Sequence, residues 1–504
     1  MTAFAGVKIP SYADDLYEKY HIEYDGEFIS LIAIGRIEYD AKYDLKVWNL
    51  FYDADKTYSS IDVAGNAGVS VVDNNSSTTI VSLENNEFEL YITETGKYLI
   101  NNTITWDFPS GDPVLTLTGT RGVILPYRPE REITESLKFA TDIIESYDGD
   151  EQRIPMRFSP EQAFTFKYYL ESGDYDSLEL IFLLQNTKFY IPIWTMKTRT
   201  ADNLPYSTPL RVRCDTTGRG FTIGDSIIIW DAKTNYEVVT VSAVDATYLE
   251  FTETLTGTYT KPYVIPIRQT FIEGTTKSVF TKHKEGYYNF NYKIAEPLII
   301  TGYLPTYSLN SIPIIYDYNH YDGDTNTSNF KTGNQFIDFN TGLVNVKPFW
   351  TVPKEIKGFG WYKNTFAEIY ELYQFLHYIK GRQKVFYAPT FYGDFQLSSA
   401  YTSTDTYIDV VNNGQDELYN SDRRNAIVVW LNGTAYPRQI NSIIENTDGT
   451  LRVTLASAFG VNLASGSYGS WLVPYRLDSD TIELKWDMVG EIKISTTFCE
   501  INNN

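Results

Sequence analysis

Short stretches of alternating apolar and polar residues dominate the first 130 positions. Residues 22–24 and 28–32 flank Asp25-Gly26, a dipeptide that suits a two-residue hairpin because both turn positions need positive φ. Residues 88–92 alternate Phe, Leu and Ile with Glu and Tyr, which is the period of a strand with one buried face. The pattern therefore predicts an N-terminal β domain over residues 1–130.

Two further stretches are interpreted from polarity and turn residues. The stretch Val71–Thr79 is polar enough to predict an exposed loop. Residues 135–145 fit two periods, because apolar positions alternate as in a strand and also recur as in a helix. We favour the strand. Asp148-Gly149 then marks a turn, and Pro155 interrupts any regular continuation.

Three short sequence motifs of the first half of the chain recur in the second half in the same order. The matches are Phe189–Pro192 with Phe386–Pro389, Trp230 and Tyr236 with Trp430 and Tyr436, and Val264–Arg268 with Leu472–Arg476. Their separations of 197, 200 and 208 residues drift slowly, as small loop insertions would make them. Self-similarity of this kind predicts a duplicated unit. Short strand-like words that recur by chance are the alternative.

In each copy, short apolar runs are bounded by Asp, Asn and Gly. This pattern predicts that each copy folds as a small barrel or compact sandwich. One helix precedes the second copy. Thr365 and Glu368 form a capping box, five apolar residues from Phe366 to Ile379 share one face, and Gly381 stands where a left-handed C-cap belongs. Residues 175–185 predict a shorter helix or a strand in the first copy.

The predicted fold is mainly β, a multidomain β-sandwich or small β-barrel architecture with a duplicated barrel unit and one or two helices. Its predicted segments are 1–130, an N-terminal β domain; 131–185, a linking β segment; 186–275, the first barrel repeat; 276–364, a connecting β segment; and 365–504, the helix with the second repeat and C-terminal strands. A chain of 504 residues exceeds a single core, so three or four domains are expected.

Composition narrows the classes of function. A net charge of −22 argues against nucleic acid as a partner, because phosphate binding needs clustered Lys and Arg. The 41 tyrosines suit surfaces that are packed on one side and wet on the other. Cys214 and Cys499 are too few for a disulfide scaffold or a zinc cluster and are expected to be reduced. Neither a signal peptide nor membrane insertion is expected.

Motifs for catalysis are missing from the sequence, so we expect no enzyme and no cofactor. There is no nucleophile elbow, zinc-binding helix or phosphate-cradling loop, and the four histidines are solitary. Asp322–Asn326 copies the start of a calcium loop, but Thr327 and Gly333 stand where Gly and Glu belong, so a plain turn is favoured and no metal is expected. A glycosidase pair among the 64 acidic residues stays open, because two carboxylates meet only in space.

Several short motifs of the sequence resemble those of a known protein family. They are Thr141-Asp142, Tyr147-Asp148-Gly149, Glu151-Gln152-Arg153, Gly381-Arg382 with Pro389, and Arg476-Leu477 with Ser479–Glu483, which includes Asp480. The stretches that contain them, about a third of the chain, are similar to tail-tip and baseplate proteins of tailed bacteriophages, including relatives of the hub proteins of gene transfer agents. The first 120 residues carry no such resemblance.

The resemblance implies a structural protein of the virion tail, made in the host cytoplasm, which forms a homo-oligomeric ring and contacts other tail proteins. Arg153 is expected to pair locally with Asp148, Asp150 or Glu151; alternatively, this turn contacts a neighbouring subunit. A tail protein that binds a receptor or host surface glycan is the second hypothesis, and a polysaccharide-degrading hydrolase is the third.

Overall fold

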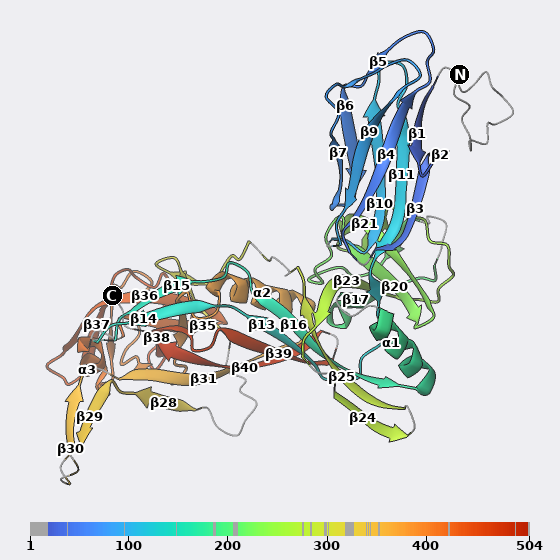
Figure 1. The fold of residues 1–504 in the computed structure, drawn as a ribbon. Helices are drawn as coiled ribbons and strands as arrows, with labels where there is room; N and C mark the ends of the chain where they lie inside the picture. Colours follow the sequence, from blue (N-terminus) through green and yellow to red (C-terminus); the bar gives the residue numbers. More distant parts are fainter. Residues whose placement is uncertain are drawn as a thin grey trace. The chain divides into compact units, whose positions relative to one another are not determined.

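The computed structural model describes residues 19–501, apart from 38, 95, 148, 185–187, 205–209, 275–276, 283–284, 297–299, 301, 318–326, 339, 341, 343, 351–352, 422–423 and 489. Strands account for 55% of the chain and helices for 7%, which confirms the mainly β prediction (Figure 1). The described residues include three α-helices, where one or two were expected. The chain divides into two compact units, residues 1–130 with 166–296, and residues 131–165 with 297–504.

An N-terminal β-sandwich opens the first unit (Figure 1, blue). One sheet has the order β2-β1-β4-β9-β7 and the other β3-β11-β10-β6. The bounds are β1 Tyr20–Tyr24, β2 Glu27–Ile29, β3 Leu31–Ile37, β4 Ala41–Asn49, β5 Lys56–Thr57, β6 Ser60–Gly65, β7 Val69–Asp73, β8 Thr79–Ile80, β9 Asn85–Ile92, β10 Leu99–Asp107 and β11 Val114–Arg121. Leu45, Phe88 and Trp106 are fully buried in the core of the sandwich, where apolar burial is the main stabilising term.

The sequence predicted most of this sandwich correctly. β1 and β2 pair across Asp25 and Gly26, whose φ values of 51° and 79° confirm the expected turn. Phe88, Leu90 and Ile92 are buried as their alternation predicted. The loop predicted over Val71–Thr79 is wrong at its start, because Val71 and the two residues after it pair with β9. Pairing with a neighbouring strand outweighs local polarity there.

The first repeat supplies the rest of the first unit, apart from residues 161–165 at the start of β16, which belong to the second unit. Its elements are β16 Glu161–Leu170, α1 Ser172–Leu184, β17 Phe189–Pro192, a 3-10 turn at Trp194–Met196, β18 Thr198–Arg199, β19 Arg211–Arg213, β20 Ser226–Ala232, β21 Asn235–Asp245, β22 Tyr248–Phe251, β23 Tyr263–Ile272, β24 Lys277–Lys282 and β25 Glu285–Ile294. β12, Val123–Ile124, runs parallel to β17. α1 shows that the uncertain segment 175–185 begins as a helix.

The second repeat and three strands that precede the first repeat form the second unit. The bounds are β13 Ile133–Lys138, β14 Thr141–Glu145, β15 Glu151–Pro155, β26 Ser308–Leu309, β27 Ile312–Pro313, β28 Ser328–Lys331, β29 Asn334–Asp338, β30 Val344–Pro348, β31 Lys354–Lys363, α2 Phe366–Ile379, β32 Phe386–Pro389, β33 Phe395–Gln396, β34 Tyr407–Val410, α3 Gln415–Asn420, β35 Ala426–Leu431, β36 Thr434–Glu445, β37 Leu451–Leu455, β38 Tyr468–Leu477, β39 Thr481–Met488 and β40 Glu491–Glu500. β13 and β14 confirm the strand favoured for residues 135–145.

α2 has the predicted start and a slightly different end. The Thr365 side chain accepts a hydrogen bond from the Glu368 amide, as the capping box requires. The buried face includes Ile369, Tyr373 and Leu376, as expected. The left-handed C-cap is Lys380, with φ of 54°, and Gly381 follows it with φ of 65°.

Strand pairings confirm the duplication. In the first repeat β23 pairs with β17, β18, β20 and β25, and β21 pairs with β20 and β22. In the second repeat β38 pairs with β32, β33, β35 and β40, and β36 pairs with β35 and β37. Both β21 and β36 carry a bulge at the matching place. Among the described residues no closed barrel is found, so the sandwich alternative describes the repeats.

The duplication begins further toward the N-terminus than the three matched sequence motifs indicated. We call β13–β15, residues 133–155, the first arm, and β28–β30, residues 328–348, the second arm. β14–β15 pairs Thr141 with Pro155, and β29–β30 pairs Asn334 with Pro348, so the two hairpins have the same length and register at a constant separation of 193 residues. Each arm strand, β13 or β28, then pairs with the strand before the repeat's helix, β16 or β31.

No helix among the described residues is long and apolar enough to cross a lipid bilayer. Cys214 and Cys499 are buried and free.

Candidate functional site

Several residues that carry the resemblance to phage tail proteins lie together inside the second unit. Those of the first arm contact those of the C-terminal strands there. The Arg476 guanidinium donates two hydrogen bonds to the Glu151 carboxylate, at 2.6 Å through Nε and 2.9 Å through Nη2. Lys354, at the start of β31, adds an ion pair at 3.0 Å from Glu151 and another at 2.9 Å from Glu145. These contacts join the first arm to the body of the second repeat, residues 354–500.

This ion-pair cluster is buried, so solvent screens its charges little and the loss of one partner should strongly affect stability. The side chains of Glu151, Arg476 and Lys354 are 5, 8 and 3% exposed. Burial alone would raise the pKa of Glu151, but the hydrogen bonds and charges of Arg476 and Lys354 outweigh burial and lower that pKa to about 2. Glu151 is therefore ionised in the folded protein at neutral pH, and the buried charges of the cluster depend on one another.

A second polar centre lies at Asp480. Its carboxylate accepts hydrogen bonds from the amide and hydroxyl of Thr141, at 2.9 and 3.0 Å, and from the amide and Nε of Arg382, at 2.9 and 3.0 Å. Arg382 also donates to the Thr141 carbonyl at 2.8 Å. Gly381 lies against Asp480, where a side chain would collide with the carboxylate. Thr141, Gly381, Arg382 and Asp480, which all carry the family resemblance, thus meet in one contact.

The remaining resemblance residues lie around the turn of the first arm. Gly149, with φ of 93°, lies against the Trp350 ring, and Tyr147 is 82% exposed and near Phe349. Gln152 is exposed. Asp148 lies outside the described residues.

Arg153 lies within the electrostatic influence of Glu151, as the local pairing predicted, but no hydrogen bond or ion pair joins it to Asp150 or Glu151 among the described residues; Asp148 is not one of these. The Nη1 atom of Arg153 is buried without a hydrogen-bond partner among them. The Glu151 carboxylate binds Arg476 and Lys354 instead, because burial of those two cations requires a nearby anion.

A buried carboxyl group on β13 was missed by the sequence analysis. Glu135 is fully buried and accepts hydrogen bonds from the Tyr373 hydroxyl, from Gln162 at 2.7 Å and from the Trp486 indole at 3.0 Å. All three donors are neutral, so burial dominates and raises the pKa of Glu135. The signal available in the sequence was a Glu at an inward position of an alternating strand.

Glu135 predicts a pH dependence of stability. Because its folded pKa is raised, its favourable contribution is complete below the ordinary glutamate pKa and is lost as the pH rises toward the folded value. The wild type should therefore lose stability relative to Glu135→Gln as the pH rises from the ordinary glutamate pKa into the range above it. Denaturant unfolding of both proteins across that range measures the difference. A difference that does not change with pH would contradict the prediction.

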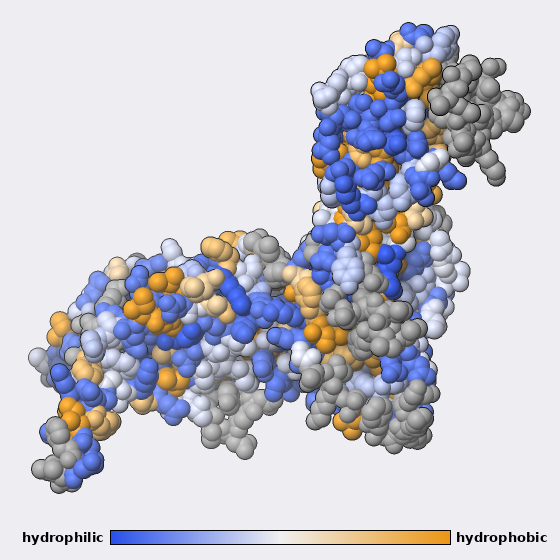
Figure 2. Space-filling view, in the orientation of Figure 1, coloured by the Kyte–Doolittle hydropathy of each residue, from blue (hydrophilic) through white to orange (hydrophobic). Residues whose placement is uncertain are grey.

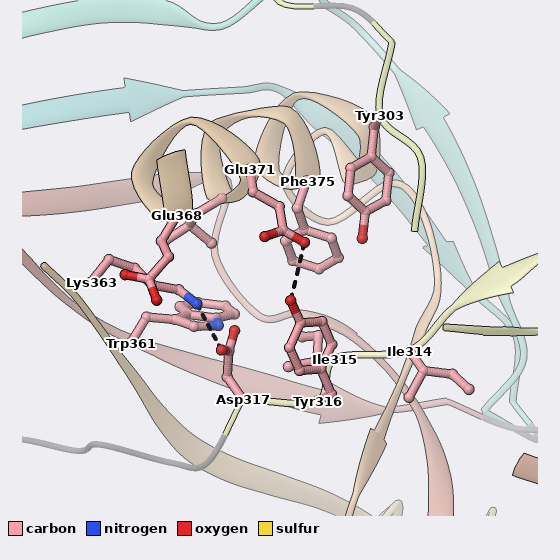
Figure 3. A pocket seen from close by; sticks show the side chains of 11 residues that line it. Tyr303, Ile314, Ile315, Tyr316, Asp317, Trp361, Lys363, Glu368, Glu371 and Phe375 are labelled. Atoms are coloured by element: carbon pink, nitrogen blue, oxygen red, sulfur yellow. Dashed lines mark hydrogen bonds and ion pairs between the residues drawn. The ribbon is translucent and has the colours of Figure 1, made fainter. Parts of the chain in front are cut away.

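A pocket lies between α2 and the chain before β28 (Figure 3). Lys363 binds Asp317 at 2.7 Å, and the Tyr316 hydroxyl donates to Glu371 at 3.2 Å. Glu368 accepts from the Thr365 hydroxyl at 3.0 Å as part of the capping box. Each of these three carboxylates already has a hydrogen-bond or ion-pair partner, in the pocket lining or in the cap of α2. The pocket lining therefore supplies no argument for a reaction.

Metal and histidine chemistry find no support in the described part of the chain. There, no group of three or more His, Cys, Asp or Glu side chains could hold a metal ion. The calcium-like stretch Asp322–Asn326 lies outside the described residues. His377 lies 6.2 Å from the Phe139 ring, and burial, with Lys380 nearby, lowers its pKa to about 4.

No protein-family model matches the chain, and no curated protein sequence matches it either.

Proposed function

We propose that the chain is a structural component of a bacteriophage tail, in the tip, hub or baseplate region, and that it acts through contacts with copies of itself and with other tail proteins. The observation that carries this proposal is the pair of equivalent arms: the first is locked onto a repeat body, and the second has no such cover among the described residues. A chain built of repeated docking units suits an assembly.

The resemblance residues support a structural role through their contacts. Glu151, Arg476, Arg382 and Asp480 all bind one another or the backbone, and together they hold the first arm to the second repeat. Groups that are saturated by such contacts stabilise a fold and are not available to a substrate. We therefore propose that the chain is not an enzyme.

The distribution of exposed aromatic side chains favours a scaffold over a glycan-binding protein. A sugar site needs aromatic rings grouped on one domain, whereas contacts in an assembly need them in several places. The most exposed rings occur in both units: Tyr39 and Tyr52 in the first, and Tyr147, Phe158, Phe330, Phe336, Tyr392 and Tyr468 in the second.

Localisation in particles tests the proposed function directly. Gold-labelled antibodies against the recombinant chain should mark one end of the tail in phage particles from the host that makes it. Label on the capsid, or no label on intact particles that contain the chain, would contradict the proposal. A sugar-release assay on purified chain is the complementary test, because robust turnover would favour the hydrolase.

A further inference from the structure

The hairpin β29–β30 of the second arm exposes apolar side chains. Phe336, Val344 and Val346 are 68, 53 and 50% exposed. Figure 2 shows apolar atoms over this hairpin, at the lower left. A two-stranded hairpin alone is at best marginally stable in water, and grouped exposed apolar side chains mark interaction sites. The second arm therefore has the character of a surface that another protein surface covers.

The first arm shows what covers the equivalent face. At the constant separation of 193 residues, Phe336, Val344 and Val346 correspond to Ile143, Glu151 and Arg153. The latter three are half-buried as whole residues, and the Glu151 side chain lies against Arg476 and Lys354. In the first arm this face thus rests on the body of the second repeat.

Strand pairing accompanies that contact. β13 of the first arm runs antiparallel to β39, with Ser136 opposite Glu483. The counterpart of β39 in the first repeat is β24, because β24–β25 and β39–β40 have the same register and a bulge at the same place. Among the described strands, β24 pairs with β25 and β28 pairs with β31, and neither has a partner on its other edge.

We infer that the second arm of one copy docks onto the first repeat of the next copy, with β28 antiparallel to the free edge of β24. The inference rests on the proposed function in that it takes the chain to assemble with itself. It repeats between chains the contact that β13 makes with β39 within one chain. Because the two surfaces differ, copies join head to tail, which closes a ring if the rotation permits.

The side chains of the two partners complement this contact. Arg268 is the counterpart of Arg476 and already binds Asp225 of its own repeat at 3.1 Å. An arm that docks there needs no carboxylate, and the second arm carries Val344 where the first carries Glu151. Unpaired edge strands readily accept a further strand, so the contact between copies combines apolar burial with main-chain hydrogen bonds.

The equivalence also predicts the register. Asn329 is the counterpart of Ser136 and Lys277 that of Glu483, so these two residues should face each other between neighbouring copies. Residues directly opposite on antiparallel strands lie about 4.5 to 5.5 Å apart between Cα atoms, within the range that a disulfide bridges.

Cysteine cross-linking of the full chain tests this register. Under mild oxidation, a mixture of Asn329→Cys and Lys277→Cys proteins should give a covalent dimer, while either variant alone should not. The double variant should give a ladder of higher covalent species. Asn329→Cys mixed with Ser60→Cys, on the N-terminal sandwich, is the matched control and should not cross-link. The two native cysteines are buried and should not interfere.

Introducing negative charge on the second arm provides a second measurement. Phe336→Glu with Val346→Glu should abolish the high-mass species in light scattering and leave the thermal unfolding of the chain unchanged, since both side chains are exposed. Val72→Glu, at an exposed position of β7, is the control and should leave the high-mass species intact.

The outcomes separate this inference from the proposed function. A dimer from Asn329→Cys alone would show that arms meet each other symmetrically and would overturn the inference. So would an oligomer that survives the arm substitutions, or a chain that stays monomeric and does not cross-link. In each case gold labelling of tails would still decide the proposed function separately.

Discussion

Replacing Arg476 with Met should lower the free energy of unfolding by about 3 to 5 kcal/mol, because the change leaves the buried carboxylate of Glu151 with Lys354 alone. Calorimetry of the full chain measures this as a lower transition temperature for the part that contains the second repeat. Removal of one partner of a buried pair costs far more than the pair contributes, so this is the largest single-residue effect that we expect.

Arg452→Met provides the matched control. Arg452 also binds a carboxylate through two nitrogens, at 2.8 and 2.9 Å from Asp409, but its side chain is 45% exposed. Solvent screens this pair, so its loss should lower the free energy of unfolding far less than the loss of Arg476 does. Equal losses for the two variants would show that the Glu151 cluster does not hold the first arm.

Acid should weaken the same cluster. The folded pKa of Glu151 is about 2, because its partners outweigh the opposing effect of burial. A lowered pKa contributes stability that is complete above the ordinary value and is lost as the pH falls through the folded value. The stability advantage of the wild type over Glu151→Gln should therefore shrink as the pH falls from about 4.5 toward about 2, and it should stay constant near neutrality.

Local patterns in the sequence predicted local structure well. The Asp25-Gly26 hairpin and the α2 helix follow from turn chemistry, capping and periodicity, which act over a few residues. The duplication was visible in the words around Trp230 and Trp430, because the buried strands of both repeats need similar apolar runs.

Long-range contacts could not be predicted in the same way. Glu151 and Arg476 are separated by 325 positions, and nothing in their local sequence indicates that they meet. The equivalence of the second arm to the first was also missed. Both hairpins have a proline at the same position and a glycine in the turn, but the second carries Phe336 and Val344 where the first has Ile143 and Glu151. Side chains that face different partners diverge, whereas the backbone geometry persists.

Gly381→Ala is the second substitution for which we expect a large effect, about 2 to 4 kcal/mol. The residue has φ of 65°, which costs a side chain about 1 to 2 kcal/mol. In addition, a Cβ atom would overlap the Asp480 carboxylate and lie 3.0 Å from Cβ of Phe139, so Asp480 must give up hydrogen bonds to Thr141 and Arg382.

Gly433→Ala separates the two causes. Gly433 has φ of 78° but no atom within 4 Å of the added Cβ, so its substitution should cost only the backbone term, about 1 to 2 kcal/mol. Thermal unfolding of both variants measures the difference. If the two losses were equal, the close approach of Gly381 to Asp480 would contribute nothing. A larger loss for Gly381→Ala would mean that the first arm requires a residue without a side chain at this position, because Asp480 joins Thr141 of the arm to Arg382 of the second repeat.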